Sequence, residues 1–361
     1  MMTVKEIAKM CGVSPSTVSN AINGKSNISE QTRNKILDCI EKMGYQPNYF
    51  ASNIRKQNTK TIGIIAEDIG QFSTADILES AMACCEEHGY RAVIINLRMY
   101  DKWADTWYND EQKLQNVMNP ILSELQAIHV DGLVYIAGHG RLINCIPESF
   151  KIPTVIAYGW SSRNRFPSVV PDDVEGGYEM MKYLISQGHK RVGILSGVED
   201  NLHAKARLLG CQKALAEAGI PFQPEWVYYG DWEKPSGVLG AEALLQKGVT
   251  AILCMNDLMA GGVYDYAHEN NLVVGKDFSI VGYDDQVVTE YLYPKLTTCE
   301  LPLREIGRQA ADFLIQNIIG TEKAESYEPV RLPCKMVCRD SVLRISDSPE
   351  EKGDERERND C

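Results

Sequence analysis

Side chains that could read the edges of DNA bases are concentrated in one short segment that begins at Pro15. Ser16 and Asn20 are four residues apart, so a helix that starts at Pro15 would carry both on one face. The amide of an asparagine can pair with adenine in the major groove. Thr17 is suited to anchoring a phosphate or to capping the helix. These residue types indicate recognition of nucleic acid rather than catalysis.

Two short helices are predicted to position these groups. The first is indicated by apolar residues at i, i+3, i+4 and i+7, namely Val4, Ile7, Ala8 and Cys11. Gly12 allows a tight turn, and Ser14 followed by Pro15 combines an N-cap with a residue whose φ is already helical. Val18 and Ile22 would lie on the buried side of the second helix. The pattern predicts a helix-turn-helix, and an αα-hairpin in an ordinary helical domain is the alternative.

A third helix would complete a small core. It is predicted to begin at Glu30 after the N-cap Ser29 and to end at Gly44. Its inner face is expected to hold Ile36, Leu37, Ile40 and Met43.

The charge of the chain is unevenly distributed. The 361 residues carry a formal net charge of −12, but residues 1–60 hold nine Lys/Arg against four Asp/Glu. Only this N-terminal part is suited to meeting the phosphates of a nucleic acid. The last segment, 346–361, contains seven acidic and three basic residues and is expected to be a disordered acidic tail.

From Thr61 onward the sequence changes to short apolar strands that alternate with amphipathic helices. Strands are expected at 61–66, 92–95, 132–136, 153–157, 191–195, 251–254 and 279–282, and helices at 75–88, 111–128, 176–187, 204–218, 257–269 and 301–319. The alternation predicts parallel sheets with helices on both faces, arranged as two doubly wound α/β lobes. Ligands of such sheets bind at the carboxyl ends of the strands.

No catalytic or metal-binding arrangement is evident in the sequence. The Gly-His-Gly run at 138–140 lacks the rest of a dinucleotide fingerprint, and a Gly-Lys-Ser/Thr phosphate loop is absent. Cys334 and Cys338 lack partners at a zinc-ligand spacing. Other cysteines are expected to fill the core in a reducing compartment, as at Cys84, Cys85, Cys211 and Cys254. Without a long apolar run or a signal peptide, we expect a cytoplasmic protein that is neither an enzyme nor a metal or cofactor binder.

Three motifs give the chain a family resemblance. They are T-V-K-E-I-A-x-x-x-G-V-S-x-x-T-V-S-x-x-x-N from Thr3, then Thr32-Arg33, then Gly-Tyr-Gln-Pro-Asn at 44–48. In these motifs the sequence resembles the lactose-repressor (LacI/GalR) family of bacterial transcription regulators. The resemblance implies an all-α helix-turn-helix domain at 1–46 and a hinge helix and linker at 47–60. It further implies a two-lobed effector-binding and dimerisation domain at 61–345, with the clamshell fold of periplasmic binding proteins.

The resemblance also implies which residues contact DNA. They are Pro15, Ser16, Thr17, Asn20, Asn23, Asn48 and Ile54. In the family the hinge helix, here about 48–56, pairs with its twin from a second subunit and wedges an apolar side chain into the minor groove. Here Ile54 stands where leucine is usual and Ser52 where arginine is usual. A flexible tether is the alternative for this segment.

The effector contacts implied by the resemblance come from both lobes. They are Phe72, Asp172, Arg207, Trp232, Asn256 and Asp284, of which Phe72 and Asp172 match least well. An aromatic platform, a guanidinium and a carboxylate are suited to a sugar. Segment 302–320 should belong to the first lobe, so the chain would cross between the lobes three times. Trp103 and Trp107 could either cap the cleft or pack under a loop.

The resemblance therefore implies a sequence-specific repressor. It would be a homodimer, bind a palindromic operator and respond to a small effector, a sugar, held between the lobes. A periplasmic-type solute-binding protein shares the clamshell, but it would need an export signal and would lack the DNA-binding head. A doubly wound enzyme is the other rival, and no motif favours it.

Overall fold

The computed structural model describes residues 3–22, 28–44, 59–104, 110–320 and 327–345. The chain divides into two compact units, of which the first contains the residues up to Thr59 together with the short stretch Ala127–His129, and the second contains the rest. Asn23, Asn48, Ile54, Trp107 and the acidic tail lie outside the described residues.

The first unit, which we call the head, contains the three predicted helices. They are α1 (Val4–Cys11), α2 (Pro15–Ile22) and α3 (Glu30–Lys42). Gly12 has a φ of 69°, the left-handed conformation that the turn between α1 and α2 requires. The Ser14 hydroxyl accepts a hydrogen bond from the backbone N–H of Thr17 at 3.1 Å, and Ser29 caps α3 in the same way. The predicted helix starts at Pro15 and Glu30 are confirmed, while α3 ends at Lys42, two residues before the predicted stop at Gly44.

A small apolar core holds the head together. Its buried members are Ile7, Ala8, Cys11, Val18, Ala21 and Ile36, with Cys39 and Ile40 packed against them. The prediction for the inner face of α3 is wrong for two residues, since Leu37 is 42% exposed and Met43 is 41% exposed. Leu37 is one residue, or about 100°, around the helix from the buried Ile36. Met43 is the C-cap at the end of α3.

The second unit, which we call the body, contains two parallel sheets. The first-lobe sheet has the order β13-β7-β5-β3-β1-β2 and the second-lobe sheet the order β11-β10-β8-β9. The first comprises β1 (Thr61–Ala66), β2 (Arg91–Asn96), β3 (Gly132–Ile136), β5 (Thr154–Ala157), β7 (Ser168–Pro171) and β13 (Val330–Leu332). The second comprises β8 (Val192–Ser196), β9 (Val227–Tyr229), β10 (Ala251–Cys254) and β11 (Ser279–Val281). Short strand pairs are formed by β4 (Leu142–Ile143) with β6 (Trp160–Ser161), and by β12 (Thr298–Glu300) with β14 (Lys335–Val337).

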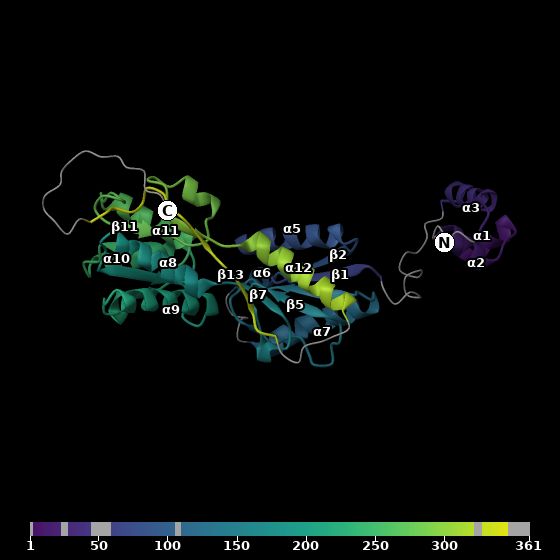
Figure 1. The fold of residues 1–361 in the computed structure, drawn as a ribbon, viewed down its shortest axis with the longest axis horizontal. Coiled ribbons are helices and arrows are strands. Elements are labelled where there is room, and N and C mark those ends of the chain that lie inside the picture. Colours follow the sequence, from purple (N-terminus) through teal and green to yellow (C-terminus); the bar gives the residue numbers. More distant parts are fainter. Residues whose placement is uncertain (1–2, 23–27, 45–58, 105–109, 321–326, 346–361) are drawn as a thin grey trace. The chain divides into compact units, whose positions relative to one another are not determined.

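Helices cover both faces of the first sheet (Figure 1). Gly63 on β1 meets Leu125 of α7 (Glu111–Ala127) on one face, and Gly132 on β3 meets Leu314 of α12 (Leu303–Ile319) on the other. The remaining helices are α5 (Phe72–Glu87), α6 (Met99–Trp103), α8 (Asp173–Ser186), α9 (Leu202–Glu217), α10 (Lys234–Leu245) and α11 (Asp257–Glu269). The predicted α/β class with two doubly wound lobes is confirmed.

Some elements were not predicted from the sequence. Strand β9 has only three residues, too few for an alternating pattern to be recognised. Helix α10 opens with Lys-Pro-Ser-Gly, a composition typical of a loop. The predicted core cysteines, Cys84, Cys85, Cys211 and Cys254, are buried free thiols.

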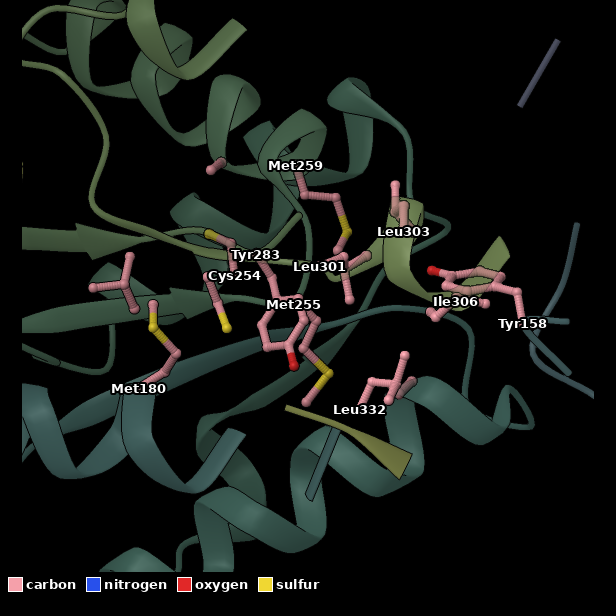
Figure 2. Close-up of a cluster of buried hydrophobic side chains, with 14 of the residues drawn as sticks. Tyr158, Met180, Cys254, Met255, Met259, Tyr283, Leu301, Leu303, Ile306 and Leu332 are labelled. Atoms are coloured by element: carbon pink, nitrogen blue, oxygen red, sulfur yellow. The ribbon is translucent and has the colours of Figure 1, made fainter. Parts of the chain in front are cut away.

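The chain passes between the lobes three times, as the resemblance implied. It leaves the first lobe after β7, returns between β12 and α12, and leaves again between β13 and β14. Figure 2 shows the apolar cluster beside these crossings, in which Ile306 and Leu332 of the first lobe lie near Met255 and Tyr283 of the second. This packing joins the two lobes at the place where the chain crosses between them. No helix among the described residues is long and apolar enough to cross a membrane.

Candidate nucleic-acid interface and interlobe cavity

The N-terminus of α2 carries a cluster of hydroxyl groups. The Ser14 hydroxyl lies 2.6 Å from that of Ser16 and 2.8 Å from that of Thr17. Pro15 and Ser16 are exposed, while Asn20 is half-buried on the same helix. Hydroxyls and free backbone N–H groups at a helix N-terminus are suited to phosphate oxygens and base edges. Ser14 caps α2 by accepting from the Thr17 N–H, so Thr17 is not the capping residue and phosphate anchoring stays the prediction for its hydroxyl.

A cavity of about 120 Å³ lies between the two lobes of the body. Its walls include five of the six predicted effector residues, namely Phe72, Arg207, Trp232, Asn256 and Asp284. Phe72 and Asn256 stand at the start of helices, Trp232 and Asp284 follow strands, and Arg207 lies in the second turn of α9, all near the carboxyl ends of the sheets, where doubly wound folds bind ligands. The structure thus brings these five together, and ligand binding by them stays a prediction.

Asp172, the sixth predicted residue, does not line the cavity. Its carboxylate accepts a hydrogen bond from the backbone N–H of Glu175 at 3.2 Å and so caps α8. The next residue, Asp173, is fully buried and contacts the cavity residues Arg207 and His203 instead. Neither carboxylate is among the residues that line the cavity, so an effector contact by Asp172 is not supported by its position.

Arg207 is the centre of a buried charge network. Its Nε donates to Asp173 Oδ1 at 2.7 Å, and its Nη1 donates to the carbonyl oxygen of Met255 and lies 3.8 Å from Asp284 Oδ1. Burial disfavours the Asp173 carboxylate, but Arg207 and His203 outweigh it and hold the pKa of Asp173 below its usual value. Burial also raises the pKa of Asp284 to about 7, although Arg207 opposes the shift.

Asn256 supports Trp232 rather than facing the cavity with free groups. Its Nδ2 donates to the carbonyl oxygen of Trp232 at 2.8 Å, and its Oδ1 accepts from the backbone N–H of Met259 at 2.9 Å. The indole ring lies directly against Gly197, where a Cβ atom would come within 2.0 Å of it. The tryptophan face is therefore fixed from two sides.

Three cavity residues hold their backbone in a conformation that side chains disfavour. The φ angles are 61° at Tyr158, 74° at Trp232 and 113° at Asp284. Backbone strain of this kind is retained where the surrounding structure enforces it, and it is concentrated at functional sites.

Family comparisons match both parts of the chain. Residues 3–48 match the family described as bacterial regulatory proteins, lacI family, and residues 181–342 match a periplasmic binding protein-like domain. The ribose operon repressor of Haemophilus influenzae is 30% identical over 347 residues, which cover 96% of this chain and 100% of that protein. The chain belongs to the LacI family.

Solved structures of LacI-family proteins share the fold. The lac repressor dimer bound to operator and the anti-inducer ONPF matches with a TM-score of 0.80 and 25% identity, over 95% of this chain and 99% of that chain. A LacI-family regulator from Enterococcus faecium with bound ribose matches with a TM-score of 0.63 and 25% identity, over 79% of this chain and 100% of that chain. The protein is therefore a DNA-binding transcriptional regulator of the LacI family.

Sequence reasoning missed the residues through which this LacI-family member joins its lobes at the cavity. The backbone N–H of Leu202 donates to the carbonyl oxygen of Gly140 at 2.8 Å, across the cleft. The ring of His203 lies between those of Tyr158 and Trp160, with centroid separations of 4.4 and 4.9 Å. The sequence signal for this contact is the Gly-His-Gly run that follows β3, which by itself only fails to complete a dinucleotide fingerprint. A Cβ at Gly140 would lie 2.3 Å from the His203 ring, so the lobes approach closely here.

Segment 98–110 contains Trp103 and Trp107. Among its described residues, Tyr100 of α6 lines the cavity. Its backbone N–H donates to Asp68 Oδ2 at 2.8 Å. Trp103 is not among the lining residues, and the Lys113 ammonium lies 5.7 Å from the centre of its ring. Of the two alternatives, Trp103 packs beside a neighbouring helix rather than capping the cavity.

The cavity of this LacI-family protein carries little unpaired positive charge. Arg207 is the one lysine or arginine among the described lining residues, and Asp173 already pairs with it. Burial lowers the pKa of the lining His139 to about 3, so that ring is neutral. Asp231, Glu233 and Asp284 also line the space. Among the described residues, no group of three or more His, Cys, Asp or Glu side chains could hold a metal ion.

Proposed function

We propose that the protein is a cytoplasmic, homodimeric repressor without enzymatic activity. Residues 1–46 would bind a palindromic operator, 47–60 would form the hinge, 61–345 would bind an effector and dimerise, and 346–361 would be an acidic tail. The observation that supports this most is the combination of an exposed Ser16 face on the head with a strained, polar cavity between two lobes. Operator selection with purified protein tests it, since recovery of no palindromic sequence would refute it.

Allosteric control would operate through the angle between the lobes. A ligand in the cavity touches both lobes, so it favours whichever interlobe arrangement gives it the better contacts. The two hinge segments of a dimer must lie together on DNA, and a change in the lobes would alter their separation. Effector binding and operator affinity are therefore coupled.

Asn20→Ala is expected to relax base preference at one position in each half-site. An asparagine that pairs with adenine contributes about 1–3 kcal/mol of discrimination, and alanine cannot replace these bonds. Selection with the variant should recover operators that are degenerate at that position alone. Asn34→Ala is the matched control, because Asn34 is exposed on α3 and no base-reading role is assigned to it. An unchanged preference in Asn20→Ala would count against the assigned contact.

The effector is proposed to be an uncharged, hydroxyl-rich molecule, a sugar without phosphate. Trp232 offers a fixed flat face for a sugar ring. Arg207 Nε and Nη1 are bonded to protein, which leaves Nη2 as a donor for a hydroxyl. A phosphate would meet Asp231, Glu233 and Asp284 without an unpaired lysine or arginine among the described lining residues, and burying such a charge is costly. The LacI-family structure with bound ribose supports the sugar class.

Calorimetry with ribose and ribose 5-phosphate, extended to other matched pairs of sugars and their phosphates, tests the ligand class. We expect that in at least one pair the neutral sugar binds and its phosphate does not. Preference for any phosphorylated member would overturn the assignment while leaving DNA binding untouched.

Ligand affinity is expected to rise with pH between about 6 and 8. Burial holds the pKa of Asp284 at about 7, so its carboxyl is largely protonated at pH 6 and ionised at pH 8. The ionised oxygen is the better acceptor for a ligand hydroxyl. Ligand affinity should therefore increase by up to about tenfold over this range, as expected when binding is linked to the loss of one proton. Calorimetry of Asp284→Asn should give a pH-independent affinity, and a persisting slope would assign the effect to another group.

A further inference from the structure

Two thiols meet in the core of the head. Cys11 is the last residue of α1 and is 4% exposed, while Cys39 lies on α3 and is half-buried. Both belong to the same small apolar cluster, in which Cys39 packs against the buried core that contains Cys11, and the Cys39 thiol raises the pKa of Cys11. Residues from two different helices are thus placed as a dithiol pair.

The surroundings of the pair give the two thiols different reactivity. Burial raises the pKa of Cys11, and the neighbouring thiol of Cys39 raises it further. Lys35 Nζ donates to the carbonyl oxygen of Cys11 at 3.1 Å and so ties α3 to the end of α1. Cys39 is the more exposed of the two thiols, so it is the one that an oxidant can reach, and Cys11 is placed to resolve the product.

We propose that Cys11 and Cys39 form a reversible disulfide that lowers the affinity of the head for operator DNA. The oxidant is a low-molecular-weight disulfide. The Cys39 thiolate attacks one of its sulfurs, the S–S bond breaks and one thiolate leaves. The Cys11 thiolate then attacks Cys39 Sγ in the mixed disulfide and expels the second thiolate. The two cysteines are oxidised by two electrons, the external disulfide is reduced to two thiols, and these take up the two protons.

The position of Cys11 links this reaction to DNA recognition. Cys11 directly precedes Gly12, and the turn is closed by a hydrogen bond from the backbone N–H of Val13 to the carbonyl oxygen of Ala8 at 3.0 Å. A disulfide requires an S–S separation of about 2.05 Å, much shorter than contact between two thiols. Bond formation therefore draws the end of α1 toward α3. The turn that sets the N-terminus of α2, where Ser16 is exposed, must shift with it.

The experiment uses the full chain and the operator DNA recovered by selection. Protein is treated with oxidised glutathione, the cross-linked peptides are mapped by mass spectrometry, and operator affinity is measured by fluorescence anisotropy before and after treatment. A Cys11–Cys39 linked peptide and a loss of about tenfold in affinity, or more, are expected, with recovery after addition of dithiothreitol.

Matched variants separate this pair from other thiols. Cys39→Ala, with Cys39→Ser as a second variant in case alanine unfolds the head, should keep its affinity after oxidation. Cys299→Ala should respond like the unmodified protein, although Cys299 contacts Cys334 in the body. Absence of the Cys11–Cys39 peptide, unchanged affinity once it has formed, or an equal response in Cys39→Ser would each overturn the proposal.

Discussion

Asp173→Asn is expected to destabilise the body by about 3–5 kcal/mol, since it removes the buried charge that balances Arg207. The Asp173 carboxylate accepts from Arg207 Nε at 2.7 Å and lies 2.6 Å from His203 Nδ1, and all three side chains are buried. An asparagine has a similar shape but no charge, so the guanidinium would remain buried without its counter-ion. Urea denaturation followed by tryptophan fluorescence measures the change in the free energy of unfolding.

The neighbouring carboxylate provides a matched control for this substitution. Asp172→Asn makes the same chemical change one residue earlier in the chain. The Asp172 carboxylate caps α8 and is not bonded to Arg207. Asparagine is as good an N-cap as aspartate, so the expected change is within about 0.5 kcal/mol. Similar losses in the two variants would mean that Asp173 carries no special electrostatic role.

Ile36→Ala is expected to unfold the head and abolish operator binding. Ile36 is 0% exposed, and it is one of six buried side chains in the core of the head as far as its residues are described. Truncation of a buried isoleucine costs about 2–5 kcal/mol, a large part of the stability available to a domain of this size. Operator affinity by anisotropy, together with helical circular dichroism of the full chain, measures the effect.

The adjacent Leu37 is the control for the packing of α3 against the core of the head. Leu37 is 42% exposed, so Leu37→Ala should leave both folding and operator affinity close to those of the unmodified protein. If Leu37→Ala were as damaging as Ile36→Ala, the side of α3 assigned to the core would be incorrect.

The candidate site was predictable where a residue type and its position along the chain were sufficient. Trp232 and Asp284 follow strands at the carboxyl edge of a parallel sheet, and Arg207 lies early in the helix that comes after another strand of that sheet. Asp172 lies outside the cavity because its carboxylate caps α8, and the sequence cannot distinguish this capping carboxylate from the adjacent buried one of Asp173. Asn256 lines the cavity, but its amide is used to hold Trp232, a contact that sequence spacing cannot reveal.

The sequence by itself determined the three helices of the head, the α/β character of the body and the LacI-family resemblance. These depend on local preferences, on apolar periodicity and on motifs that are contiguous along the chain. The tertiary structure alone decided which side chains share a cavity, that Leu202 and Gly140 join the lobes, and that the thiols of Cys11 and Cys39 meet. The physical reason is that burial, ion pairing and close approach depend on distances between segments far apart in sequence, and these distances are set only when helices and sheets pack.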